Sequence, residues 1–228
     1  MTKAFSKYQI ATGITILFHI IGLIGILYFD KSFFSAATPI NLLLSFALLV
    51  WTQQQKNTAF FIFLLFVISV GIMVEIIGVN TGYLFGDYSY GKNLGVKIKN
   101  VPLIIGINWF IIIYCCGISI HTLLMKAISK IAEQTKKPPL ALKVMSVIAD
   151  GATLAVFFDW LMEPVAIKLG FWQWADGHIP IFNYISWFVI SMLMLAVFHY
   201  TRFNKQNKFA IHLLMIQMMF FLLLRTFL

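Results

Sequence analysis

Charged residues are scarce in this sequence. They make up 11% of the 228 residues, and only eight residues are Asp or Glu. A soluble domain carries about a quarter charged residues, so most of this surface must face something other than water. Hydrophobic residues instead reach 61%, and the mean hydropathy is +0.89. Apolar runs recur at roughly the 20 residues that a helix needs to cross a bilayer, which predicts an all-α membrane protein.

Several classes of site are also missing from the sequence. The two cysteines, Cys115 and Cys116, are adjacent within one apolar run, so they indicate nothing about an oxidising compartment. The five histidines are scattered singly, which argues against a di-iron membrane hydroxylase or desaturase. The sequence holds no dinucleotide-binding glycine motif, no P-loop and no nucleophile-elbow motif. We therefore expect no metal and no cofactor.

The excess of basic residues is explained by the anionic lipids of a membrane. The formal net charge is +9, and anionic lipid headgroups attract such a chain, so nucleic-acid binding is not expected. Most lysines and arginines fall on the side of the N-terminus, which predicts that this end is cytoplasmic in the inner membrane of the cell. The first apolar run has no small-residue cleavage site and is expected to be a retained helix.

The apolar runs predict a polytopic transmembrane helical bundle of about seven helices. Only helices or closed barrels satisfy the backbone within lipid, and the short alternating strands of a barrel are not visible in the sequence. The whole chain, 1–228, is expected to form a single transmembrane domain. The second run is short, so six crossings are the alternative. The expected spans are 9–29, 40–51, 59–80, 101–125, 144–169, 181–200 and 209–228.

Four of the acids lie in or at the ends of these spans: Glu75, Asp150, Asp159 and Glu163. A carboxylate in a membrane is costly unless it is paired or protonated, so each is a candidate functional residue. The alternative is that they hydrogen-bond neighbouring helices. Asp159 and Glu163 are four residues apart and share a helix face. Two close carboxylates resist ionising together, so one is expected to keep the proton that a general acid needs. Asp150 is out of phase and is expected to have a structural role.

A pattern of an acid, a glycine, aromatic residues, a proline and a tryptophan occurs twice. The copies are Glu75, Gly82, Tyr83, Pro102 and Asn108-Trp109, and then Glu163, Gly170, Phe171, Pro180 and Ser186-Trp187. The third and fifth spans run in the same direction, so the repeat is parallel, with core units of about 59–125 and 144–200 related by a pseudo-twofold axis along the membrane normal. The two glutamates are then expected to face each other in one acidic, aromatic-lined cavity on the non-cytoplasmic side.

Two of these features have a second interpretation. An interfacial aromatic belt also explains some of the tyrosines and tryptophans. A weakly polar stripe of Asn108, Cys115 and Ser119 either lines the same cavity or forms a seam between packed helices.

The residues of the two repeats form two extended motifs. The first comprises Glu75, Gly78, Thr81-Gly82, Phe85-Gly86, Tyr88, Tyr90, Leu94-Gly95, Val101-Pro102 and Trp109. The second comprises Asp159, Glu163-Pro164, Trp172, Trp174, Pro180, Asn183 and Trp187. Together they resemble the signatures of the carotenoid biosynthesis membrane proteins, a family that includes carotenoid hydratases. The chain departs from these signatures at Glu163, where aspartate is expected, and at Asn100, where glycine is usual.

The resemblance implies a cofactor-independent hydratase, which adds water to the terminal double bond of an acyclic carotenoid end group. Asp159 or Glu163 would donate the proton, and Glu75 would activate the water. The expected partners are membrane lipid, a hydrophobic carotenoid substrate and other enzymes of the carotenoid pathway. The expected substrate-binding residues are Tyr83, Tyr88, Tyr90, Asn108, Trp109, Trp172, Trp174, Asn183 and Trp187.

Three other functions stay open at the level of sequence. A secondary transporter also shows repeats and acids near the bilayer midplane. A carotenoid cyclase or isomerase would use the same protonation chemistry but lose a proton in place of capturing water. An assembly role in a pigment complex needs no chemistry at all.

Overall fold

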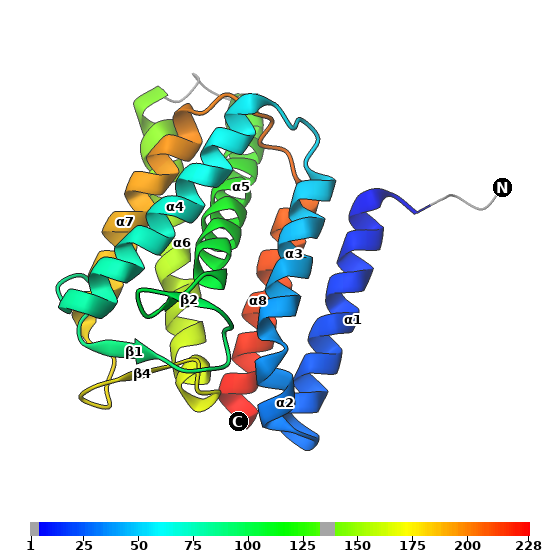
Figure 1. The fold of residues 1–228 in the computed structure, drawn as a ribbon. Coiled ribbons are helices and arrows are strands. Elements are labelled where there is room, and N and C mark those ends of the chain that lie inside the picture. Colours follow the sequence, from blue (N-terminus) through cyan, green and yellow to red (C-terminus); the bar gives the residue numbers. More distant parts are fainter. Residues whose placement is uncertain (1–4, 133–139) are drawn as a thin grey trace.

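The computed structural model describes residues 5–132 and 140–228, which form a bundle of helices (Figure 1). Three lysines that support the predicted orientation, Lys3, Lys136 and Lys137, lie outside the described residues. The expected polytopic helical bundle is confirmed. Its helices are α1 (Lys7–Tyr28), α2 (Lys31–Ala36), α3 (Thr38–Thr52), α4 (Thr58–Thr81), α5 (Ile104–Ala132), α6 (Leu140–Lys168), α7 (Ile181–Tyr200) and α8 (Lys208–Phe227).

Within the described ranges, six helices are long and apolar enough to cross a membrane, namely α1 and α4 to α8. Helix α3 has 15 residues and follows the short α2 directly, so the two together rise from one end of the bundle to the other (Figure 1). The start of α1 and the end of α8 lie at opposite ends of the bundle, as an odd number of passes requires (Figure 1). The short second span predicted from the sequence is therefore a pass completed by α2.

Polar side chains fix where several helices begin. The Asn57 side chain accepts a hydrogen bond of 3.0 Å from the Phe60 amide at the start of α4, and Ser6 forms a capping box with Gln9 at the start of α1. Such caps satisfy amides that have no partner within the helix. Because caps and apolar runs are both local features, the predicted spans agree with the observed helices to within a few residues over most of the chain.

Helix α5 lies at the centre of the bundle and packs against α3, α4, α6, α7 and α8. In its apolar stretch 78% of the residues are buried, against 28% to 44% in the other five long helices. The outer helices expose large apolar side chains such as Leu65 on α4 and Leu193 on α7. An outer surface of this kind suits lipid and not water.

The internal repeat is present in the fold. Helices α4 and α5 form the first unit, and α6 and α7 form the second, with α4 and α6 running in the same direction (Figure 1). Each first helix ends at a glycine in the left-handed region, Gly82 with φ 70° and Gly170 with φ 69°. Only glycine adopts this conformation without strain, so the chain turns in the same way after both helices.

A short two-stranded ribbon joins the two units, a feature that the sequence did not predict. Strand β1 (Tyr88–Tyr90) pairs antiparallel with β4 (Trp172–Trp174), and Ser89 lies opposite Gln173 at the centre. Two further hydrogen bonds extend the ladder symmetrically: the Gly91 amide donates to Phe171 at 2.8 Å, and the Ala175 amide donates to Asp87 at 2.9 Å. The pseudo-twofold axis therefore passes between Ser89 and Gln173.

The longer connection of the first unit contains a hairpin of β2 (Lys97–Ile98) and β3 (Val101–Pro102). Its two turn residues have positive φ, 45° at Lys99 and 69° at Asn100. A two-residue hairpin turn with positive φ at both positions favours glycine or asparagine. This geometry accommodates Asn100 at the position where the resemblance leads us to expect glycine.

Candidate active site

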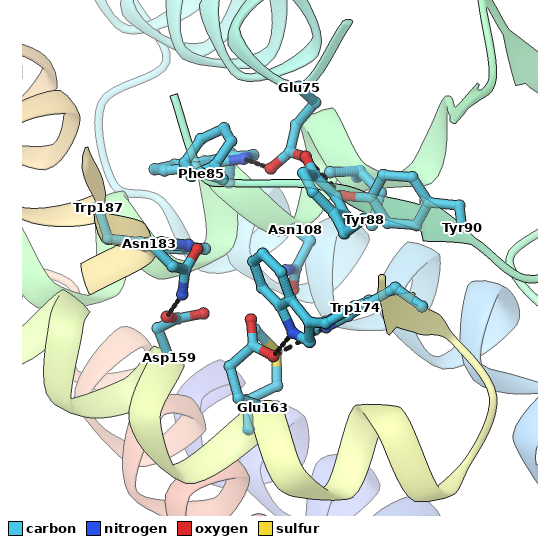
Figure 2. A pocket seen from close by; sticks show the side chains of 14 residues that line it. Glu75, Phe85, Tyr88, Tyr90, Asn108, Asp159, Glu163, Trp174, Asn183 and Trp187 are labelled. Carbon is cyan, nitrogen blue, oxygen red and sulfur yellow. Dashed lines mark hydrogen bonds between the residues drawn. The ribbon is translucent and has the colours of Figure 1, made fainter. Parts of the chain in front are cut away.

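A cavity of about 30 Å³ lies between the two repeat units, and most of the side chains that line it are buried (Figure 2). It brings together all three acids proposed as catalytic from the sequence: Glu75, Asp159 and Glu163. Among the described residues, no lysine, arginine or histidine lines it. Eight of the nine expected substrate-binding residues are also in its wall, namely Tyr88, Tyr90, Asn108, Trp109, Trp172, Trp174, Asn183 and Trp187. The acids and the aromatic residues thus line one shared cavity, as the repeat suggested.

Glu75 is held by three donors. The hydroxyls of Tyr88 and Tyr90 both donate to its Oε2 atom, Tyr90 at 2.7 Å. The indole N–H of Trp109 donates to Oε1 at 2.9 Å. Both carboxyl oxygens of Glu75 are therefore occupied, and the side chain is only 5% exposed. A carboxylate accepts hydrogen bonds and donates none, so this set of donors suits the ionised form.

Glu163 has a matching environment made of different residues. The indole N–H groups of Trp172 and Trp174 donate to its Oε2 atom at 2.9 and 3.0 Å. In the symmetric ribbon, Trp172 and Trp174 are the counterparts of Tyr88 and Tyr90. The repeat thus places an aromatic pair on each glutamate, two phenols in one unit and two indoles in the other. No hydrogen bond from the described residues reaches Oε1 of Glu163.

Asp159 is the least satisfied of the three acids. The Asn183 amide donates to its Oδ2 atom at 2.9 Å, while its Oδ1 atom is buried and has no hydrogen-bond partner among the described residues. The side chain itself is 0% exposed. A buried polar atom without a protein partner indicates a bound water, a ligand or a proton of its own.

The aromatic walls meet at the centre of the site. Trp109 and Trp187, which are counterparts in the repeat, stack with ring centroids 4.0 Å apart and planes inclined by 14°. Tyr88 also packs against Trp174 across the ribbon, with ring centroids 5.1 Å apart. Burial, followed by the proximity of the Glu75 carboxyl, raises the pKa of Tyr88 and Tyr90 well above the ordinary value of a phenol. Both tyrosines therefore stay neutral and keep their protons as hydrogen-bond donors.

Some predicted residues are not brought to the cavity. Tyr83 is 79% exposed, because it follows the turn at Gly82 and projects away from the bundle; its expected place in the substrate site is not supported. Asp150 is exposed and accepts a hydrogen bond from Ser146, in line with the structural role expected of it. Cys115 and Ser119 are buried outside the cavity, so most of the polar stripe is a helix-packing seam.

Three apolar residues of the cavity wall were not proposed as site residues: Phe85, Ile105 and Met162. Phe85 belongs to the first extended motif, so a signal for it was present in the sequence. Ile105 is the counterpart of Asn183 in the repeat, which could have identified it. Within the described parts of the chain, no group of three or more His, Cys, Asp or Glu could hold a metal ion.

Comparison with known proteins agrees with this architecture. The family model described as "Carotenoid biosynthesis protein" matches residues 37–228. A bisanhydrobacterioruberin hydratase from Haloarcula japonica is 22% identical over 131 residues, which cover 56% of this chain and 40% of the relative. The matched region is thus less than half the length of that relative. No solved structure matches the chain. The family match extends over most of the sequence, so the chain belongs to the carotenoid biosynthesis protein family.

Proposed function

We propose that this protein is a carotenoid hydratase, which adds water to the terminal double bond of an acyclic end group and forms a tertiary alcohol. The observation that carries the proposal is the cavity with three buried carboxyl groups and tryptophan walls. The family and the name of the distant relative support it independently. Hydration of such an alkene needs a proton for carbon, an environment that shields the resulting cation, and a positioned water.

The hydrogen-bond pattern favours Asp159 as the proton donor. Glu75 accepts three hydrogen bonds, Glu163 accepts two, and Asp159 accepts one. Each donated hydrogen bond stabilises the charged form of a carboxyl group. Asp159 is therefore the acid least stabilised as an anion, and its unpartnered Oδ1 is the atom that would carry the proton into the cavity.

The reaction can be written as a balanced sequence. The π electrons of the terminal double bond take the proton from Asp159 and form a C–H bond at the less substituted carbon. The positive charge then rests on the tertiary carbon, where a water oxygen forms the C–O bond. A carboxylate accepts the surplus proton of that water. Return of this proton to Asp159 completes the cycle, so the net reaction consumes one water and no cofactor.

Glu163 is the better placed base for the water. Its Oε1 atom accepts no hydrogen bond from the described residues, whereas both oxygens of Glu75 are occupied. This assignment differs from the expectation that Glu75 activates the water. In the proposed mechanism Glu75 instead supplies a fixed negative charge opposite the cation, held in place by Tyr88, Tyr90 and Trp109.

The cavity has room for the water that this chemistry requires, and its walls suit a cation. A water needs about 10–15 Å³ of such space, so a cavity of about 30 Å³ holds one or two waters. The aromatic faces, among them the Trp109–Trp187 stack, can stabilise a desolvated cation by about 2 kcal/mol or more. Water is thus present in a small number, and the cation is protected from other nucleophiles.

The proposal is tested by the pigments of a bacterial host that makes acyclic carotenoids, with and without this chain. We expect a new, more polar carotenoid that is heavier by one water. A product of unchanged mass would indicate a cyclase or isomerase. An unchanged pigment profile across several acyclic substrates, with the protein shown to be in the membrane, would overturn the proposal and turn attention to transport.

A further inference from the structure

An apolar groove adjoins the acidic cavity. It has a volume of about 220 Å³ and lies among α1, α2, α3, α6 and α8. Three of these helices, α1, α3 and α8, contact one another on the side of the bundle opposite α7 (Figure 1). The groove shares a residue with the cavity, Asn108 on α5, which lines both. The two spaces are therefore neighbours on either side of this side chain.

The groove is open to the outside of the bundle. Phe33 and Ile40 at its rim are 65% and 67% exposed, whereas Phe158 and Phe171 deeper in its wall are 1% and 5% exposed. In a membrane, an opening between transmembrane helices faces acyl chains. A long apolar molecule dissolved in the bilayer can enter there without crossing water.

Asn108 marks the junction between the two spaces. Its side-chain amide forms no hydrogen bond with the described residues, and the side chain is half-buried. Figure 2 shows it between the Glu75 and Glu163 sides of the cavity. A cavity of about 30 Å³ has room for water but not for a branched hydrocarbon end group as well. The reactive end of a substrate therefore needs space beyond the cavity, and the groove on the other side of Asn108 is an adjoining apolar space.

We infer that this groove is the binding channel for the polyene chain, with the reactive end directed past Asn108 towards Asp159 and Glu163. This inference rests on the proposed function. The mainly apolar lining, the opening towards lipid and the position next to the cavity at Asn108 all favour a long isoprenoid polyene as the occupant. A volume of about 220 Å³ is below the roughly 300–1,000 Å³ of drug-sized sites, so only the end section of the chain is held and the rest stays in the bilayer.

Two glycines on α1 provide a matched test. Gly22 lines the groove, and a Cβ atom there would lie 3.7 Å from the Phe220 ring, an ordinary contact. Gly13 is exposed on the same helix, and a Cβ atom there would meet nothing within 4 Å. Leucine favours a helix over glycine at both positions. Gly22→Leu should therefore fill the groove without loss of folding, and Gly13→Leu is its control.

The readout is the polyene retained by purified protein, measured by absorbance in the Asp159→Asn background so that substrate is not converted. We expect Gly22→Leu to lower the retained pigment by about tenfold, the effect of losing the burial of one aliphatic group, while Gly13→Leu retains as much as the parent. Ala37→Leu, which narrows the groove from another wall, should act like Gly22→Leu.

Failure of the inference and failure of the proposed function are distinguishable. If both glycine variants retain equal pigment while the unsubstituted chain hydrates carotenoids in cells, the groove does not hold the polyene and the inference is wrong. If Gly22→Leu loses pigment but the unsubstituted chain forms no hydrated product in cells, the channel stands and the hydratase proposal fails. Equal thermal unfolding of both variants confirms that the comparison concerns binding and not folding.

Discussion

Asp159 occupies, in the second repeat unit, the position that Gly71 occupies in the first. Gly71 leaves no room for a side chain, because a Cβ atom there would lie 2.8 Å from the Cβ atom of Trp109. The residue that donates a hydrogen bond to Asp159 also has no polar counterpart, because Asn183 corresponds to Ile105 in the first unit. The repeat thus supplies two similar glutamates but only one aspartate, and this asymmetry points to a single reactive position in the cavity.

Replacement of that aspartate tests its role as proton donor. Asp159→Asn keeps the shape of the side chain and removes the proton, so hydration should fall by about 10²- to 10⁴-fold, the usual contribution of a general acid. Asp150→Asn on the same helix is the control, because Asp150 is exposed and outside the cavity. Hydrated pigment per unit of membrane protein is the measurement. Full activity of a folded Asp159→Asn variant would rule out this donor.

The two tyrosines that donate hydrogen bonds to Glu75 should be needed for activity, whereas the exposed Tyr83 should not. Tyr88→Phe or Tyr90→Phe removes one hydrogen bond to the Glu75 carboxyl. A hydrogen bond to a charged group contributes about 1.5–3 kcal/mol, so activity should fall by about tenfold or more in each variant. Tyr83→Phe, at an exposed position, should leave activity unchanged. Equal activity of all three variants would show that these hydroxyls do not support the reaction.

Substitutions of the two stacked tryptophans can distinguish the effect of ring stacking on the rate from the effect of the hydrogen bond to Glu75. Trp109→Phe loses the stack and the N–H donor to Glu75, whereas Trp187→Phe loses the stack alone within the described contacts. We expect both to lower the hydration rate and Trp109→Phe to lower it further, by about another tenfold for the lost hydrogen bond. The ratio of the two rates is the measurement. A ratio near one would mean that the Trp109 hydrogen bond has no catalytic effect.

Asn100 should tolerate glycine but not alanine. Its φ of 69° is in the left-handed region, where residues with an ordinary Cβ lose roughly 1–2 kcal/mol. Asn100→Ala should therefore lower the free energy of unfolding in detergent by about 1 kcal/mol, and Asn100→Gly should change it little. Thermal unfolding of the two variants side by side measures the difference. Alanine and glycine variants of equal stability would contradict this explanation.

The predicted orientation can be tested with thiol labelling. Cys115 and Cys116 are both 0% exposed, so an introduced cysteine can be labelled selectively by a membrane-impermeant maleimide. Asp176 is exposed in the loop after β4, and Gln206 is exposed in the connection from α7 to α8, at the other end of the bundle (Figure 1). With a cytoplasmic N-terminus, Asp176→Cys should react in intact cells and Gln206→Cys only after permeabilisation. The reverse pattern would invert the topology.

The sequence by itself determined the helices and the repeat. Hydropathy over about 20 residues and capping side chains such as Asn57 act locally, so the spans could be read without knowing how they pack. The spacing of Glu75 to Gly82 and of Glu163 to Gly170 is local in the same sense. It placed the two glutamates at the same depth on helices of the same direction, and from this the shared cavity followed.

Only the tertiary structure decided what each acid contacts. The pairing of β1 with β4 joins segments more than 80 residues apart, and short strands carry too little local signal to be predicted. This pairing brings Tyr88 and Tyr90 to Glu75, brings Trp172 and Trp174 to Glu163, and leaves Tyr83 outside. The unpartnered oxygen of Asp159 and the groove beyond Asn108 likewise depend on how α1, α3 and α8 pack around α5 and α6. These contacts are set by the packing of distant segments, which hydrophobic periodicity along one helix does not encode.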